Sequence, residues 1–299
     1  MQEPVLEGCF KTDQELTDPL LRPGNTNCGG CGMSIAWNML SHARGTHELQ
    51  VVIPACCGIV TAGHYPVSSY GAPTVASTFA SSAAVAAGLA LVMEMNNEDK
   101  RAVCFAGDGG TYDIGMATLS AAAERNDDIL YICYDNEIYG NTGGQRSSAT
   151  PLGATTTTTP GGKKMQKKDI TAIMAAHRIP YVASISLAHL EDTQRKMKYA
   201  LETRGFRFLH VFAPCPTGWK SEQAEGINLI RMAVDSGLFP VMEIFDGETR
   251  QINVEPSMSD EALETYFSSQ GRFKKNKVDI ATIRAAIDAN WARLRRGVS

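Results

Sequence analysis

The sequence predicts an α/β fold, in which a mostly parallel β-sheet carries helices on both faces. Short apolar runs, typical of buried strands, alternate along the chain with segments of helical periodicity. Glycine and polar residues follow at once where two of these runs end, at 107–110 and at 135–137. The chain has 299 residues, 43% hydrophobic and 20% charged, an ordinary composition for a globular protein with one large or two small cores.

Composition also excludes several classes of protein. The net charge of −4 and the lack of a basic tract argue against a nucleic-acid partner. The longest nearly apolar stretch, 81–95, is too short to span a bilayer, so we expect no membrane association. Residues 1–23 are polar and acidic rather than signal-like, so we expect a cytoplasmic location. Eight cysteines in such a chain then favour metal binding over a secreted disulfide scaffold.

The N-terminal part is expected to contain an arm, a helix, a strand and a second helix. Residues 1–24 are predicted to form an arm that packs on a partner chain. A helix is expected over 33–40, a buried strand over 51–53 and a long small-residue helix over 77–95. The polar and aromatic loop 64–73 is expected to border the active site.

The central stretch reads as one βαβ unit. A strand over 102–106 ends in a glycine-rich turn, a helix follows over 114–125, and a second strand covers 129–134. Cys104 and Cys133 lie inside these strands, where they are expected to be buried.

The remaining chain is predicted to continue the alternation within a domain over 25–275, followed by a helical tail over 276–299. Residues 147–168 form a long loop whose lysines either are solvated or contact an acidic partner or coenzyme A. Helices are expected over 170–177, 190–204 and 222–236, strands over 181–184, 208–212 and 241–245, and further helical segments over 266–273 and 279–295.

The strand ends of the βαβ unit suggest a metal-bridged diphosphate. Ligands in parallel sheets lie beyond the carboxyl ends of the strands, so Asp108 and Asn136 should be neighbours in space. Glycines allow the backbone to approach phosphate, and the following helix N-terminus favours an anion. Asp108, Asn136 and the carbonyl of Ile138 are oxygen ligands of the kind that Mg²⁺ prefers. The alternative is a plain βαβ unit with a glycine turn and an Asp cap.

Cysteines suggest a second site. Cys28 and Cys31 form a Cys-x-x-Cys pair, which alone is compatible with a redox dithiol, half a zinc site or part of an iron–sulfur site. One of Cys56 and Cys57 follows a strand, as does Cys215, so four thiolates can converge on one edge of the sheet. Both zinc and a 4Fe–4S cluster accept four such ligands.

These motifs bear a family resemblance. Gly107-Asp108-Gly109 followed about thirty residues later by Asn136 resembles the thiamine diphosphate motif. The stretch 134–164, YDNEIYGNTGGQRSSATPLGATTTTTPGGKK, resembles the β subunits of 2-oxoacid:ferredoxin oxidoreductases, with the pyruvate enzymes nearest. NCGGCGM and LHVFAPCPTGW resemble the segments of that family that bind a 4Fe–4S cluster. The implied fold is therefore a thiamine diphosphate-binding fold.

The resemblance implies a role for each matching residue. Asn141 is expected to face the reacting carbon of the cofactor and the substrate, as the catalytic residue. Magnesium is expected at Asp108, Asn136 and Ile138. The 4Fe–4S ligands are expected to be Cys28, Cys31, Cys56 and Cys215, with Cys56 preferred over Cys57 because it aligns with the cysteine of the family. The cofactor is expected to contact Gly107, Asp108, Gly109, Gly110, Asn136, Ile138, Asn141 and Thr142.

The implied reaction is oxidative decarboxylation of a small 2-oxoacid. Pyruvate would form acetyl-CoA, and electrons would pass through the cluster to ferredoxin. Oxalate, which needs no coenzyme A, is the alternative, because the loop 64–73 only approximates the family pattern; within it, His64 either binds a substrate carboxylate or is an ordinary surface group. An α-type subunit and a ferredoxin-like subunit are expected as partners, and the first should supply the glutamate for the cofactor and the arginine for the substrate.

Two rival classes each explain half of the motifs. A non-catalytic iron–sulfur electron-transfer subunit explains the cysteines but not Asp108 and Asn136. A non-redox thiamine enzyme, such as a decarboxylase, explains the Gly-Asp-Gly motif but not four converging cysteines.

Overall fold

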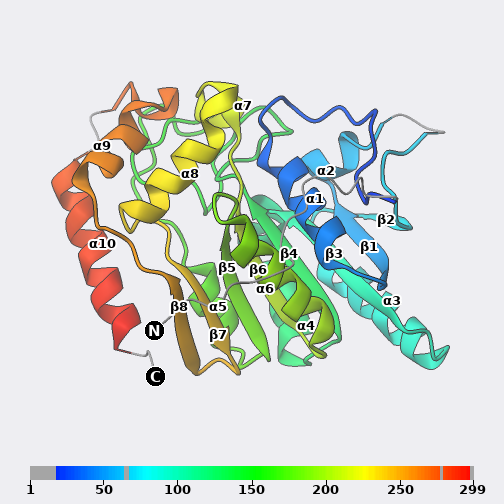
Figure 1. Cartoon of the computed structure of the whole chain (residues 1–299). Coiled ribbons are helices and arrows are strands. Elements are labelled where there is room, and N and C mark those ends of the chain that lie inside the picture. The colour runs from blue at the N-terminus through cyan, green and yellow to red at the C-terminus, as the bar shows by residue number, and fades with distance from the viewer. Residues whose placement is uncertain (1–17, 64–66, 277–278, 297–299) are drawn as a thin grey trace.

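A computed structural model describes residues 18–63, 67–276 and 279–296. Its centre is an eight-stranded sheet with the strand order β2-β1-β3-β4-β6-β5-β7-β8 (Figure 1). The pairings from β2 to β5 are parallel, whereas β7 and β8 run antiparallel at one edge. The predicted fold class is therefore confirmed. The strands are β1 (Glu48–Pro54), β2 (Thr74–Ser77), β3 (Lys100–Gly107), β4 (Ile129–Asp135), β5 (Tyr181–Ser186), β6 (Arg207–Phe212), β7 (Val241–Phe245) and β8 (Thr249–Val254).

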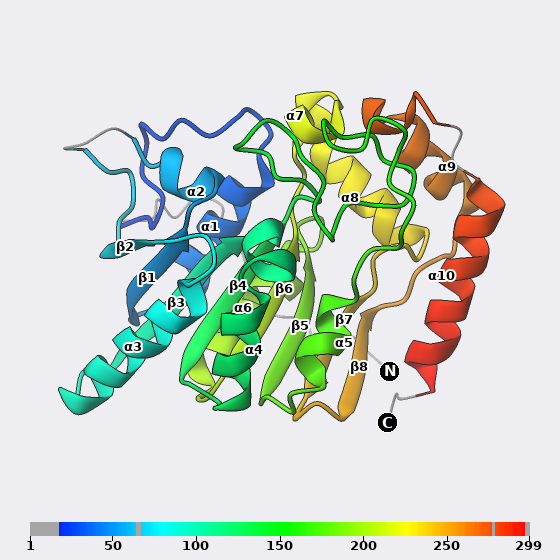
Figure 2. The same ribbon diagram turned by 180° about the vertical axis from the view of Figure 1, so that it is seen from behind.

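Helices cover both faces of this sheet, as the two opposite views show (Figures 1 and 2). One buried cluster joins the sheet to α1 and α6, a second joins it to α3, α4 and α5, and a third lies among α8, α9 and α10. The helices are α1 (Gly32–Ala43), α2 (Cys57–Val60), α3 (Ser82–Met95), α4 (Met116–Glu124), α5 (Ile170–Ala175), α6 (Leu190–Glu202), α7 (Pro216–Trp219), α8 (Gly226–Asp235), α9 (Asp260–Ser268) and α10 (Ile280–Arg295).

The structure differs from the sequence prediction in several elements. The helix expected from residue 77 begins at Ser82, because residues 74–77 pair with β1 as strand β2. The glycine-rich turn is helical, with a π-turn over Gly109–Asp113 directly before α4. The edge strand β8 was not predicted, because its half-exposed residues lack the apolar pattern of a buried strand.

Both ends of the described chain pack on the same body. Leu20 is fully buried in the first cluster, and its N–H donates to the hydroxyl of Ser41 at 2.9 Å. The described part of the predicted arm therefore packs on its own chain, and residues 1–17 lie outside the described residues. In the tail, Ile287 and Trp291 of α10 belong to the third cluster.

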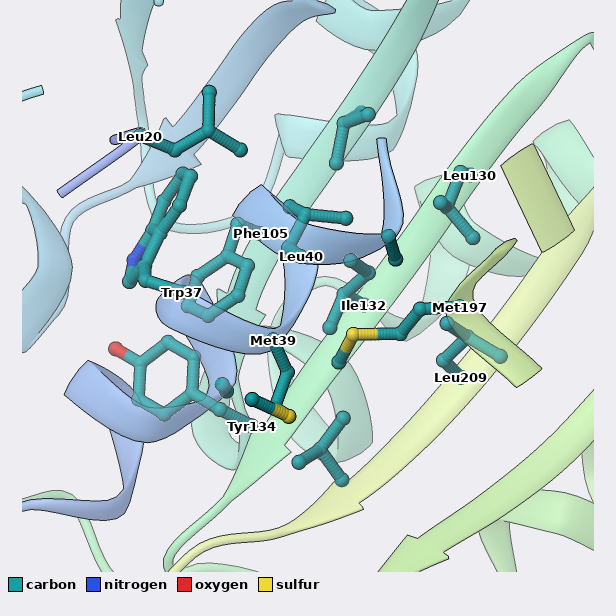
Figure 3. Packing of buried hydrophobic residues seen from close by; sticks show 14 of the residues in the cluster. Leu20, Trp37, Met39, Leu40, Phe105, Leu130, Ile132, Tyr134, Met197 and Leu209 are labelled. Carbon is teal, nitrogen blue, oxygen red and sulfur yellow. The ribbon is translucent and has the colours of Figure 1, made fainter. Parts of the chain in front are cut away.

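An aromatic column fixes α1 to the sheet beneath the carboxyl ends of the strands. Trp37 of α1 stacks on Phe105 of β3, with ring centroids 4.3 Å apart. Phe105 stacks in turn on Tyr134 of β4 at 5.2 Å (Figure 3). Each buried aromatic pair of this kind contributes about 0.5–1.5 kcal/mol beyond the area that it buries. The column therefore holds the N-terminus of α1 close to the edge where the predicted sites lie.

Candidate active site

Four predicted site residues follow four neighbouring parallel strands. The strands β1, β3, β4 and β6 are adjacent in the sheet, and all point the same way. Cys56 follows β1, Asp108 follows β3, Asn136 follows β4 and Cys215 follows β6. In both views α2 and α7, which come after β1 and β6, lie at the same edge of the sheet (Figures 1 and 2). The topology thus brings both sets of motif residues to one edge.

A cavity of about 180 Å³ opens at this edge. Phe79, Tyr134 and Tyr139 supply aromatic walls that sequence reasoning did not identify. All eight residues predicted to contact the cofactor line the same cavity, namely Gly107, Asp108, Gly109, Gly110, Asn136, Ile138, Asn141 and Thr142.

The glycine at position 109 is required by close packing. A Cβ atom there would lie 2.4 Å from Cε1 of Tyr139. The hydroxyl of Tyr139 donates to Oδ2 of Asp113 at 2.7 Å, which anchors the ring over the π-turn. Only a glycine lets the chain turn beneath this ring and keep its N–H groups beside the cavity.

Asp108 is a buried carboxyl group at the wall of the cavity. It is 2% exposed, and the hydroxyl of Ser147 donates to its Oδ2 at 2.5 Å. Burial and the nearby charge of Asp135 raise the pKa of Asp108 well above its ordinary value. Among the described residues no basic side chain forms an ion pair with it. A divalent cation in the cavity would supply the missing positive charge and favour the ionised form.

Asn136 is held from two sides. Its side-chain oxygen accepts a hydrogen bond from the backbone N–H of Ile138 at 3.3 Å, and its backbone carbonyl accepts one from the indole N–H of Trp219 at 2.8 Å. A carbonyl-type oxygen has two lone pairs, so the side-chain oxygen keeps one for a cation. The next residue, Glu137, has φ +64°, in the left-handed region, and so turns the chain back past the cavity.

A buried charge network lies behind the Asn136 turn. Lys167 contacts Asp135 at 2.6 Å and Glu137 at 3.2 Å, and Arg272 contacts Glu137 at 2.6 Å. Burial alone would raise the pKa of Asp135, but Lys167 and then His210, whose Nε2 lies 2.7 Å away, hold it well below its ordinary value. The residues on either side of Asn136 are thus fixed by ion pairs.

The loop 147–168 is a loop as predicted, but much of it is not solvated. Lys163 is 4% exposed and donates to the carbonyls of Ser148 and Thr150. Lys167 forms the ion pairs with Asp135 and Glu137 described above. This segment, rich in Thr, Gly and Lys, can be buried because its polar groups find hydrogen-bond partners within the protein. Buried or nearly buried positions include Ser147, Ser148, Ala149, Thr150, Ala154, Thr155 and Thr156.

Three of the predicted cluster cysteines are N-cap residues. Cys31 precedes α1, Cys56 precedes α2, and Cys215 precedes α7. The sulfur of Cys215 accepts the N–H of Gly218 at 3.4 Å. Burial raises the pKa of all three thiols, and donor groups that face the sulfurs oppose this rise. These sulfurs therefore sit where helix N-termini favour negative charge.

Cys57 shares this neighbourhood. Burial, followed by the charges of Cys56, Cys215, Cys31 and Cys28, raises the pKa of Cys57 to about 12. Its sulfur lies 3.5 Å from the position that a Cβ on Gly140 would take. Both members of the Cys56–Cys57 pair line the cavity.

Some predictions concern other parts of the chain. Cys104 and Cys133 are fully buried, as predicted. His64 lies outside the described residues.

Throughout the described ranges, no three His, Cys, Asp or Glu side chains are grouped so that they can hold a metal ion. The same ranges contain no helix both long and apolar enough to cross a membrane.

Comparisons with known proteins identify the family of this chain. The family model "Thiamine pyrophosphate enzyme, C-terminal TPP binding domain" matches residues 55–211, and thiamine pyrophosphate is another name for thiamine diphosphate. Ketoisovalerate oxidoreductase subunit VorB of Pyrococcus horikoshii is 42% identical over 285 residues, 91% of each chain. Pyruvate synthase subunit PorB of Methanothermobacter thermautotrophicus is 38% identical over 285 residues, 93% of this chain and 98% of that protein.

A solved structure supports the fold. The 2-oxoglutarate:ferredoxin oxidoreductase from Magnetococcus marinus, solved with 2-oxoglutarate, coenzyme A and succinyl-CoA bound, matches with a TM-score of 0.64 at 20% identity. The match covers 92% of this chain and 96% of that chain. Fold, family model and full-length relatives agree, and the chain belongs to the thiamine diphosphate-binding β subunits of the 2-oxoacid:ferredoxin oxidoreductases.

Proposed function

We propose that this chain holds thiamine diphosphate, Mg²⁺ and one 4Fe–4S cluster side by side, and that with its partner subunits it oxidatively decarboxylates a small 2-oxoacid. The observation that carries the proposal is the shared cavity wall. Cys56 lines the same cavity as Asp108 and Asn136, and it belongs to the group of thiols at this edge. Because the two sites share one wall, electrons would travel only a short distance from the thiamine diphosphate site to the cluster on their way to ferredoxin.

The described residues fit the diphosphate and its metal. Asp108, Asn136 and the carbonyl of Ile138 would hold Mg²⁺, and the N–H groups of Gly109 and Gly110 would face phosphate oxygens. When bound, thiamine diphosphate supplies the electron sink for decarboxylation. Asn141 is exposed at the mouth of the cavity, where we place it next to the substrate.

The cysteines fit a cluster better than a single zinc ion. One zinc ion needs its four sulfurs around one point, each about 2.3 Å from the metal. In a 4Fe–4S cluster each thiolate binds its own iron, so the sulfurs lie further apart. The charges of Cys56, Cys215, Cys31 and Cys28 all act on Cys57, which puts these thiols near one another, and the segments around Cys28, Cys31 and Cys215 resemble those that bind a 4Fe–4S cluster in this family. We therefore assign Cys28, Cys31, Cys56 and Cys215 to a 4Fe–4S cluster.

The neighbouring cysteine offers a matched test of this assignment. Burial raises the pKa of Cys56, and the nearby hydroxyl of Tyr134 and the backbone N–H groups of Gly58, Ile59 and Gly107 oppose this rise, which suits a thiolate ligand. We expect Cys56→Ser to lower the iron and sulfide content of the anaerobically purified enzyme, and Cys57→Ser to leave both unchanged. The reverse result would make Cys57 the ligand, and loss of iron in neither variant would refute the cluster site.

The cavity is incomplete as a thiamine site. No glutamate lies among the described residues that line it, and Glu137 is held in the ion pairs behind it. The pyrimidine ring of the cofactor needs such a carboxylate, which we assign to an α-type partner subunit. We therefore expect the isolated chain to be inactive and the assembled enzyme, including a ferredoxin-like subunit, to reduce ferredoxin.

Relatives suggest two substrate candidates. The names of the relatives described above specify ketoisovalerate, at 42% identity, and pyruvate, at 38%. Neither name supports the oxalate alternative. We propose pyruvate or the branched 2-ketoisovalerate as substrate, with coenzyme A as acyl acceptor.

Substrate assays of the assembled enzyme test this proposal. Ferredoxin reduction is measured with pyruvate, 2-ketoisovalerate and oxalate, each with and without coenzyme A. We expect a coenzyme A-dependent rate with one of the first two. Reduction with oxalate alone, or bound iron without bound thiamine diphosphate, would overturn the proposal.

A further inference from the structure

We propose that Asp113 is a positioning residue for the reaction: it holds both ends of the lobe formed by residues 139–145 and thereby fixes Asn141 at the mouth of the cofactor cavity. This inference rests on the proposed function, because it takes Asn141 as the residue next to the substrate. It links the glycine turn that would face the diphosphate to the lobe that would face the reacting carbon.

The lobe 139–145 closes on itself through Tyr139. The backbone N–H of Tyr139 donates to the carbonyl of Gln145 at 3.0 Å, and the N–H of Gly144 donates to the carbonyl of Tyr139 at 2.9 Å. Within the lobe, the side-chain amide of Gln145 donates to the carbonyl of Thr142 at 2.7 Å. Asn141 and Thr142 line the cavity but are exposed. The base of the lobe therefore sets the position of Asn141, since burial does not.

Asp113 contacts the two chain segments that meet at this base. Its Oδ2 accepts hydrogen bonds from the hydroxyl of Tyr139 at 2.7 Å and from the backbone N–H of Ser148, just beyond the lobe, at 3.0 Å. Its Oδ1 accepts a hydrogen bond from the hydroxyl of Ser148. Asp113 also ends the π-turn Gly109–Asp113, and Gly109 and Gly110 of this turn line the cavity. One carboxylate thus joins the glycine turn to both ends of the lobe.

The carboxyl group of Asp113 is ionised at neutral pH. Burial alone would raise the pKa of Asp113, but hydrogen bonds from Ser148 and Tyr139, with the charge of Lys168, hold this pKa below its ordinary value. Hydrogen bonds to an ionised acceptor are about twice as strong as those between neutral groups. The bond from Tyr139 to Asp113 is therefore a strong anchor for the start of the lobe.

Two other contacts support the lobe less specifically. The ring of Tyr139 packs edge-on against Phe79, with centroids 5.8 Å apart. Such aromatic pairs form over centroid distances of about 4.5–7 Å, so this contact tolerates a displacement that would break a hydrogen bond. Thr157 donates to the carbonyl of Gly144 from its N–H and its hydroxyl, both at 3.0 Å, on the returning side of the lobe. The side that leads into Asn141 depends on Asp113.

The test compares two tyrosine hydroxyls in the assembled enzyme. Tyr139→Phe keeps the ring and removes only the hydroxyl that donates to Asp113. Tyr181→Phe is the matched control, because the buried hydroxyl of Tyr181 also donates to a carboxylate, that of Glu243 at 2.6 Å, but Tyr181 does not line the cavity. Since a misplacement of about 1 Å can cost about a hundredfold in rate, we expect Tyr139→Phe to lower kcat about ten- to hundredfold. We also expect faster amide hydrogen exchange in residues 139–145, and neither change in the control.

A double-mutant cycle shows whether Tyr139 acts through Asn141. If it does, Tyr139→Phe causes no further loss of kcat in an Asn141→Ala background. Independent losses, or a wild-type kcat in Tyr139→Phe, would overturn the proposal. A wild-type kcat in Asn141→Ala would instead overturn the place of Asn141 in the proposed function.

Two substitutions of Asp113 test the acceptor itself. Asp113→Asn keeps one side-chain oxygen that can accept from Tyr139, whereas Asp113→Ala keeps none. We expect kcat in Asp113→Asn to lie between that of the wild type and that of Asp113→Ala, with the same order in the hydrogen-exchange rates of the lobe. Equal losses in the two variants would contradict an anchor made by hydrogen bonding.

Discussion

Gly32 provides a sharp test of how the chain positions its cysteines. Its N–H donates to the carbonyl of Pro214 at 2.9 Å, which joins the start of α1 to the segment before Cys215. A Cβ on Gly32 would lie 2.3 Å from Cδ of Pro214 and 2.8 Å from Cα of Ala213. These atoms belong to a ring and to the backbone, so they cannot move aside as a flexible side chain can. Gly32→Ala must therefore push Cys31 and Cys215 apart.

The expected cost follows from these contacts. Forcing a methyl group into a packed site costs about 1–3 kcal/mol. Loss of the Gly32–Pro214 hydrogen bond adds about 1 kcal/mol, while the better helix propensity of alanine returns up to about 1 kcal/mol. We expect the free energy of unfolding to fall by about 1–4 kcal/mol in urea titrations. We also expect the iron content of the holoenzyme to fall while bound thiamine diphosphate stays, because strands β3 and β4 form the diphosphate cavity.

Gly88 in α3 is the matched control. A Cβ on Gly88 would have no atom within 4 Å, and the residue lies in the interior of the helix. Gly88→Ala should therefore raise the free energy of unfolding by up to about 1 kcal/mol and leave the iron content unchanged. If Gly32→Ala kept full iron and matched the stability of Gly88→Ala, the close approach of α1 to Pro214 would not position the cysteines.

Three further predictions concern the carboxylates around the cavity. Ser147→Ala removes the hydroxyl that donates to Asp108, so Mg²⁺-dependent cofactor binding should weaken about ten- to hundredfold in calorimetry; unchanged affinity would contradict this role. Burial and then Asp135 raise the pKa of Asp108, so its contribution to stability is present below pH 3.8 and is lost as pH rises through the raised folded-state value. Asp108→Asn should therefore be more stable than the metal-free wild type at pH 7 in urea, but gain nothing from Mg²⁺ with thiamine diphosphate; a less stable variant would refute this. Arg272→Met leaves Glu137 with one buried partner fewer and should cost about 3–5 kcal/mol in urea, whereas the half-exposed Arg293→Met should cost less than about 1 kcal/mol; equal costs would contradict the difference in burial.

The convergence of the site was predictable because it follows from topology. In a parallel sheet every carboxyl end lies at one edge, so residues that follow neighbouring strands meet whatever their separation in sequence. Asp108 and Asn136 follow the adjacent strands β3 and β4, and Cys215 follows β6, the next strand along. The apolar runs of these strands and the polar residues after them were visible in the sequence.

The partners of these residues were not predictable in the same way. Ser147 contacts Asp108, and Arg272 contacts Glu137 across 135 positions, without any local pattern that links them. Lys167 lies in a stretch whose composition indicates a solvated loop, yet it is paired inside the protein with Asp135. Such pairings depend on how the loop 147–168 and the segment after α9 pack on the sheet. Spacing and periodicity carry no information about that packing.

The N-caps of three helices give a physical reason to expect metal at the cysteines. Ser, Thr, Asp and Asn are the usual N-cap residues because their oxygens accept the free N–H groups of the first turn. Here Cys31, Cys56 and Cys215 occupy these positions, and a neutral thiol is a weak acceptor. Burial raises the pKa of each thiol, so without metal the caps stay neutral. A metal that replaces the thiol protons would make all three N-caps anionic. Cluster binding would therefore stabilise the N-termini of α1, α2 and α7 together.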